Sequence, residues 1–140
     1  MKDFSIFEDK IGISFNNKDL LKQAFIHRSY INENQGVVFG HNERLEFLGD
    51  AVLELVTTEE LYGRFPSKPE GELTSIRAAL VNTNSISDAA KNLGVNDYLL
   101  LSKGEAKDTG KARSYILANT FEAIVGAIYL DSGYENSKKF

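Results

Sequence analysis

Residues 42–53 read Asn-Glu-Arg-Leu-Glu-Phe-Leu-Gly-Asp-Ala-Val-Leu and place three carboxylates inside an otherwise apolar stretch. Glu43, Glu46 and Asp50 follow the spacing i, i+3, i+7, so they project from one face of a helix with 3.6 residues per turn. An apolar stripe has the same rhythm on a neighbouring face, at Leu45, Leu48, Val52 and Leu55. Because an unpaired carboxylate beside a core is strongly disfavoured, a divalent cation bound by oxygen atoms is the simplest partner for these acids.

Length and composition predict one cytoplasmic domain. The chain has 140 residues, of which 42% are hydrophobic and 26% are charged, as in ordinary globular domains. It contains no cysteine, which excludes disulfides and thiolate metal ligands. No apolar run approaches the roughly 18 residues that a membrane span needs, and the first residues do not resemble a signal peptide. We therefore expect no membrane attachment.

The excess of negative charge lies in one segment of the chain. The formal net charge is −4, and residues 41–80 hold eight acids against four bases, while the segments on either side are balanced. A local acidic patch of this kind fits a site that is completed by cations. The acidic balance therefore does not exclude a partner that contains phosphate.

The pattern of apolar residues, caps and breaks predicts an all-α chain. The predicted helices run from Asn16 or Asn17 through Phe25, over 42–62, from Ser67 through Leu80, over 84–93 and over 115–130, with the beginning of one more at 134–140. Ser67 and Glu70 match the spacing of a capping box, and Gly94 and Gly133 act as stops. Two glycine-containing segments, 34–40 and 103–113, are predicted to be loops, the second of them mobile.

A second pair of oxygen ligands lies in the predicted helix 115–130. Asn119 and Glu122 are spaced i, i+3 within an apolar run, so they face the same way. Metal sites inside helix bundles are commonly built from oxygen side chains at helical spacing on two facing helices. Glu46, Asp50, Asn119 and Glu122 are therefore candidate ligands of one magnesium-like ion.

Spacing alone leaves other interpretations of these acids open. Acids three or four residues apart are also common on solvated helices. Glu43 sits in the first turn after Asn42, a predicted cap, where the helix dipole favours a carboxylate. Glu70 is equally explained as the return arm of the Ser67 capping box. Asp50 has no obvious local partner, and burying it in the core without a ligand would cost several kcal/mol.

The remaining charged residues give weaker signals. The two histidines, His27 and His41, lie far apart, and His27 is interpreted as a packing and hydrogen-bonding group at a helix end rather than as a catalyst. Five basic residues are candidates for phosphate contacts: Arg77, Lys103, Lys107, Lys111 and Arg113. A solvated loop compensated by Glu105 and Asp108 explains the last four equally well. The glycine loops that cradle nucleotide phosphates are absent.

Taken together, these segments resemble the catalytic domain of the ribonuclease III family. The run 42–53 is similar to the long signature of that family. Four further motifs support the resemblance, which extends from about Phe15 to Tyr134: Phe25-Ile26-His27-Arg28-Ser29-Tyr30, Glu70-Gly71-Glu72-Leu73, Arg77-Ala78-Ala79-Leu80-Val81, and Ser114-Tyr115-Ile116-Leu117-Ala118 continuing into Glu122-Ala123.

The resemblance implies an all-helical endonuclease domain that acts on double-stranded RNA as a homodimer and takes part in RNA processing such as ribosomal RNA maturation. Glu46, Asp50 and Glu122 would be catalytic and, with Asn119, would hold Mg²⁺, for which Mn²⁺ can substitute. Glu43 and Glu70 would belong to the same acidic site more peripherally, and Phe47 would enter a pocket of the partner subunit. Cleavage would leave 5′-phosphate and 3′-hydroxyl ends.

The chain departs from the family pattern in two respects. Asn119 stands where the family has aspartate, so the site keeps an oxygen ligand but loses one negative charge. The carboxyl-terminal double-stranded-RNA-binding domain of bacterial members is missing, so we expect residues 1–140 to be one catalytic domain taken from a longer chain. The alternative to an active nuclease is a dimeric RNA-binding module whose catalysis is weakened or lost because of Asn119.

Overall fold

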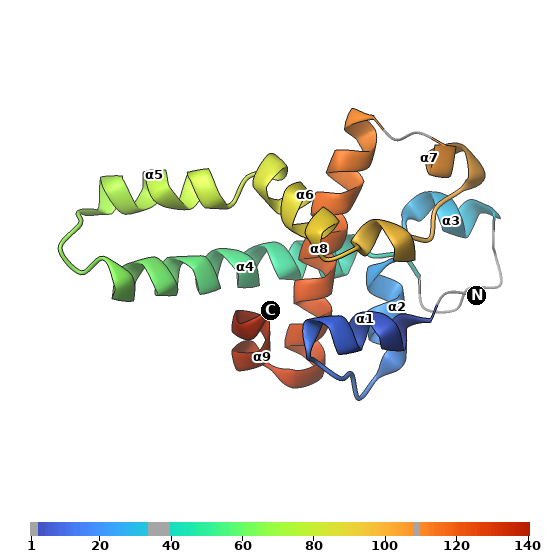
Figure 1. Ribbon diagram of the computed structural model, residues 1–140, viewed down its shortest axis with the longest axis horizontal. Coiled ribbons are helices and arrows are strands. Elements are labelled where there is room, and N and C mark those ends of the chain that lie inside the picture. Colours follow the sequence, from blue (N-terminus) through green and yellow to red (C-terminus); the bar gives the residue numbers. More distant parts are fainter. Residues whose placement is uncertain (1–2, 34–39, 108–109) are drawn as a thin grey trace.

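Helices form the whole architecture of the part of the chain that the computed structural model describes, which comprises residues 3–33, 40–107 and 110–140 (Figure 1). In chain order the elements are α1 (Phe4–Ile11), α2 (Lys18–Ala24), α3 (Arg28–Glu33), α4 (Glu43–Arg64), α5 (Glu70–Leu80), α6 (Thr83–Asn92), the 3-10 helix η1 (Val95–Tyr98), α7 (Lys103–Lys107), α8 (Lys111–Ser132) and α9 (Tyr134–Lys139). Within these residues the only strand-like pairing is a bridge between Ile26 and Leu100. The predicted all-α class is confirmed.

The two 22-residue helices α4 and α8 cross at close range and organise the molecule (Figure 1). At the crossing, a Cβ atom built on Gly49 would overlap the backbone carbonyl oxygen of Glu122. A Cβ atom on Gly126 would likewise overlap the carbonyl oxygen of Leu45. The helices therefore touch backbone to backbone, which requires glycine on both sides.

The core forms around α8, which is buried along most of its length and packs against α2, α4, α6 and α9. One side of this core is aromatic. Phe7 lies edge-on to Phe25 at a centroid distance of 5.2 Å and to Tyr98 at 5.5 Å, and Phe4 packs against both of those rings. The helix that carries Phe4 and Phe7 was not predicted, although Asp3 caps it by accepting a hydrogen bond from the Ser5 amide.

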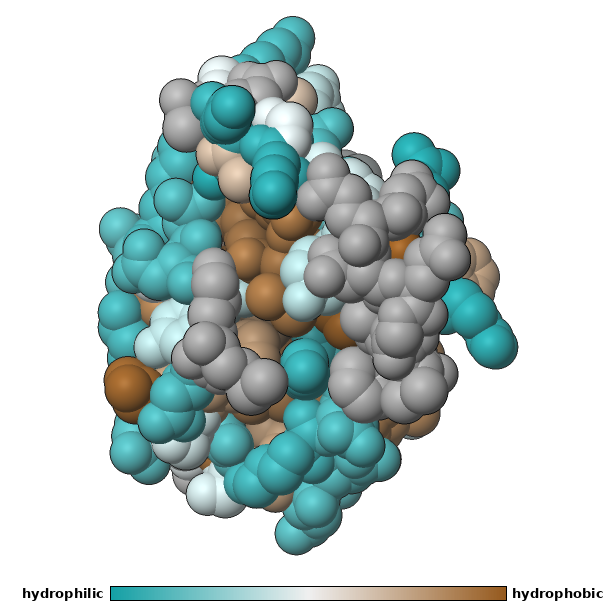
Figure 2. All heavy atoms as spheres, turned by 90° about the vertical axis from the view of Figure 1, so that its right-hand side faces the viewer, coloured by the Kyte–Doolittle hydropathy of each residue, from teal (hydrophilic) through white to brown (hydrophobic). Residues whose placement is uncertain are grey.

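Helices α4 and α5 form a hairpin that extends away from this core (Figure 1). No residue of α5 is buried, whereas α4 buries residues along its length. At the opposite end of the molecule, where α3 and α7 lie, the coloured surface is polar around its margin and apolar side chains show in its middle (Figure 2). None of the helices in the described residues has both the length and the apolar character needed to cross a bilayer.

Most predicted helix boundaries are confirmed within a few residues. Asn17 caps α2 by accepting a hydrogen bond from the Asp19 amide at 3.1 Å. Gly94 and Gly133 follow α6 and α8 with φ angles of +74° and +91°, a region that favours glycine. The residues 134–140 do form a further helix, α9. The predicted loop 34–40 lies, except for Gly40, outside the described residues.

Two predicted caps are wrong. The Asn42 side chain does not cap α4, because its amide donates a hydrogen bond to the carbonyl of Ala24 at 2.8 Å. Ser67 and Glu70 do not form a capping box, because α5 begins directly after Pro69 with no side-chain cap. Proline at this position fixes an extended backbone before the first turn, so the helix starts later than the spacing suggests.

The prediction of a mobile loop over 103–113 is also wrong for its described residues, because α7 and the start of α8 are helical there. Arg113 is buried and organises the segment. Its guanidinium donates hydrogen bonds to Asn96 Oδ1 at 2.7 Å and to the carbonyls of Glu105 and Ala106 at 2.8 and 3.1 Å. These contacts join residues that are not adjacent in sequence, so glycine content alone gave a misleading prediction.

Candidate active site

A polar pocket of about 690 Å³ lies where the amino-terminal half of α4 meets the middle of α8. Glu43, Glu46 and Asp50 line it from α4, and Asn119 and Glu122 line it from α8. The structure thus brings together, in one pocket, all four candidate metal ligands and one of the two peripheral acids.

The glycine crossing explains why these side chains meet. Glu46 and Asp50 flank Gly49 on α4, and the carbonyl of Glu122 faces Gly49 across the contact. Because the two backbones touch there, side chains from the two helices reach the same space. Separating the helices by the width of one methyl group would move Asp50 and Glu122 apart.

Electrostatic coupling within the pocket is strongest at Glu122. Burial, reinforced by a hydrogen bond with Asp50 and by the negative charges of Asp50 and Glu46, raises the pKa of Glu122 to about 8. Burial and the charges of Glu43 and Asp50 also raise the pKa of Glu46. Like charges confined in one pocket oppose further ionisation, which favours either a shared proton or a bound cation.

The acids differ in exposure. Glu46 and Glu122 are half-buried, whereas Asp50 and Glu43 are exposed, and Arg28 Nη1 lies 3.6 Å from Glu43 Oε1. Asp50 is therefore not a buried core residue, so the cost of burying it without a ligand does not arise. Asp50 lies on the exposed side of α4 and lines the pocket, so its charge faces the pocket and not the interior.

The donor set fits a hard divalent ion. Three carboxylates and one amide oxygen are the ligands that Mg²⁺ and Mn²⁺ prefer. In the described part of the chain, no three His, Asp or Glu side chains are already close enough to enclose an ion. Half-buried and exposed carboxylates on adjacent helix turns can rotate onto one ion, so the arrangement is an open pocket and not a closed structural metal cage.

The raised pKa of Glu122 predicts how stability depends on pH. Glu122 has an ordinary pKa of 4.5 in the unfolded chain and a pKa of about 8 in the folded protein, so the folded state binds more protons between these values. Without divalent ions, stability should therefore be fully present below about pH 4.5 and fall as the pH rises through 8. We expect the melting temperature to drop by about 2–5 °C relative to Glu122→Gln between pH 6 and 9. If the melting temperatures of the two proteins changed equally between pH 6 and 9, this coupling would be contradicted.

Several residues predicted for the site lie elsewhere. Glu70 lines a separate cavity of about 460 Å³ between α4 and α5. Arg77 also lines that cavity, donates a hydrogen bond to Thr58 Oγ1 at 3.0 Å and lies 3.8 Å from Glu54. Arg113 is 8% exposed and held by its own segment, so the prediction of a surface phosphate contact for it is wrong. Lys103, Lys107 and Lys111 are exposed.

The sequence interpretation missed two contributors to the pocket. His27 lines it from the segment between α2 and α3. Thr120 lines it from α8, and its hydroxyl is buried without a hydrogen-bond partner in the described structure. Helical spacing could not reveal either one, because His27 comes from a different element and Thr120 follows Asn119 directly on α8.

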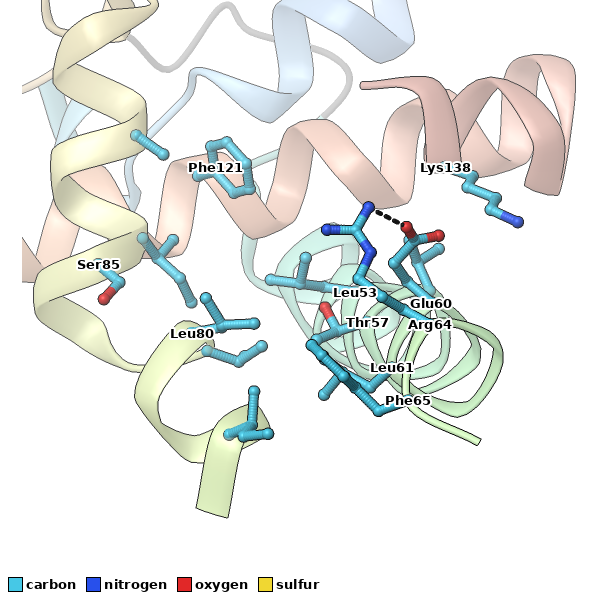
Figure 3. Close-up of a pocket in the computed structure, with 15 residues that line it drawn as sticks. Leu53, Thr57, Glu60, Leu61, Arg64, Phe65, Leu80, Ser85, Phe121 and Lys138 are labelled. Carbon is cyan, nitrogen blue, oxygen red and sulfur yellow. Dashed lines mark hydrogen bonds and ion pairs between the residues drawn. The ribbon is translucent and has the colours of Figure 1, made fainter. Parts of the chain in front are cut away.

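A second cavity, of about 610 Å³, has a different character (Figure 3). Leu53, Thr57 and Leu61 face it from α4, Leu80 lies on the opposite side, and Phe121 of α8 also lines it. The charges there are an ion pair, Arg64 with Glu60 at 2.7 Å, and Lys138. This cavity is lined mainly by apolar side chains and contains no cluster of acids. The candidate active site is therefore the polar pocket at the α4–α8 crossing.

Comparison with known proteins agrees with the resemblance. A family model described as Ribonuclease-III-like matches residues 17–140. Ribonuclease 3 of Enterococcus faecalis is 47% identical over 133 residues, which are 95% of this chain and 58% of that protein. This chain therefore spans less than two thirds of the length of that curated relative.

Solved structures match over almost the full length of the chain. A nuclease domain of ribonuclease III from Campylobacter jejuni superposes with a TM-score of 0.87 and 41% identity, covering 99% of this chain and 90% of that one. A second structure of that domain, whose description concerns flexibility in a region involved in dimer formation, gives a TM-score of 0.88 and 40% identity over 97% and 91% of the two chains. The chain belongs to the ribonuclease-III-like family.

Proposed function

We propose that residues 1–140 form the nuclease domain of a cytoplasmic, divalent-metal-dependent endoribonuclease that hydrolyses phosphodiester bonds in double-stranded RNA. The products would carry 5′-phosphate and 3′-hydroxyl ends, and RNA processing such as ribosomal RNA maturation would be the biological role. The observation that carries this proposal is the meeting of Glu46 and Asp50 with Asn119 and Glu122 in one pocket.

Glu46, Asp50, Asn119 and Glu122 would hold Mg²⁺, or Mn²⁺ in its place. When bound, such an ion makes a water molecule nucleophilic near neutral pH and stabilises the leaving oxygen. Glu122 contributes by giving up the proton through which it is hydrogen-bonded to Asp50. Because that proton and the ion compete for the same oxygens, affinity for the ion should rise with pH.

No histidine base or covalent nucleophile is needed for this chemistry. Duplex RNA is recognised mainly by its shape, its 2′-hydroxyls and its phosphates. We assign phosphate contacts to three exposed lysines at one end of the molecule, Lys103 and Lys107 on α7 and Lys111 at the start of α8 (Figure 1). Contacts of this kind depend strongly on salt, so binding should weaken steeply as ionic strength rises.

A homodimer is the second part of the proposal. Phe47 is 83% exposed, and Leu55 and Tyr62, at 56% and 77%, follow it on the same face of α4. The cavity that Glu70 lines opens beside the far end of this face. Two copies that pair these faces about a two-fold axis bring each Phe47 opposite the cavity of the other copy, and bring Glu70 towards the acidic pocket of the other copy.

Phe47→Ala should weaken this dimer. An aromatic side chain that fills a pocket is a typical interface hot spot, so we expect a loss of about 2 kcal/mol or more, roughly 30-fold in the dimer dissociation constant. Sedimentation equilibrium at micromolar concentration measures the change. Tyr129→Ala, which removes another partly exposed aromatic from α8, is the control. A dimer that is equally stable in both variants would exclude Phe47 as the anchor.

A cleavage assay on a perfect RNA duplex tests the proposed function. At low salt, with Mg²⁺ or Mn²⁺, the chain should cut the duplex and leave single-stranded RNA of the same sequence intact. Binding of the duplex without cutting in either metal would contradict the proposal. That result would support the alternative, a dimeric RNA-binding module, which the asparagine at position 119 favours.

Asn119→Asp should raise the cutting rate. The change restores one negative charge among the oxygen ligands, which strengthens binding of a hard cation. We expect at least about a tenfold gain at subsaturating Mg²⁺, because groups around a metal site commonly change affinity by about 10–100-fold. The gain should shrink at saturating metal. A variant that cuts no faster at any Mg²⁺ concentration would show that Asn119 lies outside the ion's coordination.

A further inference from the structure

His27 is held rigidly at the edge of the acidic pocket by contacts outside the acids. Its backbone amide donates a hydrogen bond to the carbonyl of Leu100 at 3.0 Å, and the backbone amide of Leu100 donates one to the carbonyl of Phe25 at 2.9 Å. Its ring Nδ1 accepts a hydrogen bond from the backbone amide of Ser29 at 3.1 Å, and Ser29 Oγ lies 2.8 Å from the same nitrogen. The backbone amide of Ser102 holds that hydroxyl in place by donating a hydrogen bond to Ser29 Oγ at 2.9 Å.

These contacts determine which ring nitrogen carries the proton. A backbone amide can only donate, so Nδ1 must accept, and the neutral ring therefore carries its proton on Nε2. Burial lowers the pKa of His27, which keeps the ring neutral near pH 7. A protonated Nε2 cannot ligate a metal ion. In this pocket His27 can only act as a hydrogen-bond donor.

Apart from the Thr120 hydroxyl and the Asn119 amide, both on α8, the pocket offers few other donors for an anion. Arg28 is engaged by Glu43, and the amide nitrogen of Asn42 is engaged by the carbonyl of Ala24. The Nε2 atom of His27 has no hydrogen-bond partner among the described residues. A neutral donor also brings no positive charge that would repel a divalent cation bound to the neighbouring acids.

We propose that His27 donates a hydrogen bond from Nε2 to an anionic oxygen of the RNA phosphate in the acidic pocket, and so orients the scissile group. This inference rests on the proposed function, because it requires a phosphodiester in that pocket. It gives His27 a direct contact with substrate that goes beyond the helix-end hydrogen bonding expected from the sequence.

Two substitutions separate this role from a structural one. His27→Asn keeps an oxygen near the Nδ1 position, where it can accept the Ser29 amide, but loses the Nε2 donor. His27→Gln places its amide nitrogen near the Nε2 position and loses the acceptor. A substrate contact therefore predicts that the asparagine variant is the more damaged in cleavage, and a purely structural role predicts the reverse order.

The test measures single-turnover cleavage of a duplex RNA, duplex binding by fluorescence anisotropy, and melting temperature for the wild-type chain and both variants. We expect His27→Asn to melt like the wild type and to cut about 100-fold more slowly, the typical cost of losing one donor to a reacting oxyanion. His27→Gln should retain cleavage within about tenfold of the wild type, as expected for a preserved donor.

Each other outcome has a definite meaning. Equal cleavage by the wild type and His27→Asn, or faster cleavage by His27→Asn than by His27→Gln, overturns the inference while leaving the proposed function standing. A wild-type chain that binds the duplex but does not cut it overturns the proposed function, and the order of the two variants in duplex affinity then tests His27. A wild-type chain that neither binds nor cuts overturns both.

Discussion

Gly49→Ala should cost this chain at least about 3 kcal/mol of folding free energy, the upper range for overpacking, because a methyl group there meets backbone and not a movable side chain. The added Cβ would overlap the carbonyl oxygen of Glu122, so α4 and α8 must separate along their whole contact. Since natural domains are stable by about 5–15 kcal/mol, such a loss leaves little folded protein near 37 °C. Urea denaturation followed by circular dichroism measures it.

Gly63→Ala is the matched control for this prediction. Gly63 lies on the same helix, is exposed, and has nothing within 4 Å of the position that a Cβ would take. Alanine is favoured over glycine inside a helix by about 1 kcal/mol, and by less in the last turn of α4, where Gly63 lies, so this variant should be at least as stable as the wild type. Equal denaturation midpoints for Gly49→Ala and Gly63→Ala would refute the close crossing of α4 and α8.

Glu122→Gln should abolish metal-dependent cutting while making the metal-free protein more stable at alkaline pH. The change replaces a negatively charged metal ligand by a neutral amide. Substituting a residue that only contacts the ligands typically costs up to about 100-fold in activity, so we expect the cutting rate to fall by more than that. The change also removes a carboxyl whose ionisation is opposed by burial and by Asp50. Above pH 8 the variant should therefore melt at a higher temperature than the wild type.

Asp9→Asn controls for the loss of one negative charge. Asp9 is exposed on α1, away from the pocket, so its neutralisation should alter neither cutting nor the pH dependence of melting. A Glu122→Gln variant that cuts as fast as Asp9→Asn would remove Glu122 from the catalytic group. Asp50→Ala should also lose cutting, with little change in stability, because Asp50 is exposed.

Periodicity was sufficient to identify the four candidate metal ligands, but it could not show that the two helices bring them together. The spacing of Glu46 and Asp50, and of Asn119 and Glu122, correctly placed each pair on one helix face. Their convergence depends on Gly49 and Gly126, which allow the two backbones to touch. No one-dimensional pattern specifies that contact, since the two glycines are far apart in the chain.

The local errors have a common physical cause, which is competition from distant partners. Asn42 looks like a helix cap, but its amide finds a better acceptor in the carbonyl of Ala24. The glycine-containing segment before α8 looks mobile, but the guanidinium of Arg113 gathers it through three hydrogen bonds. His27 was correctly interpreted as a hydrogen-bonding residue, whereas its position in the pocket emerged only from the fold.

Binding of a divalent ion by the isolated chain tests the central claim most directly, because the claim is that acids from α4 and α8 form one cation site. Isothermal titration with Mg²⁺ and with Mn²⁺, on the wild type, Glu122→Gln and Asp9→Asn at pH 8, makes the comparison without RNA. We predict saturable binding that Glu122→Gln weakens at least about tenfold and that Asp9→Asn leaves unchanged. Equal affinity in all three proteins, or no saturable binding by the wild type, would contradict the account.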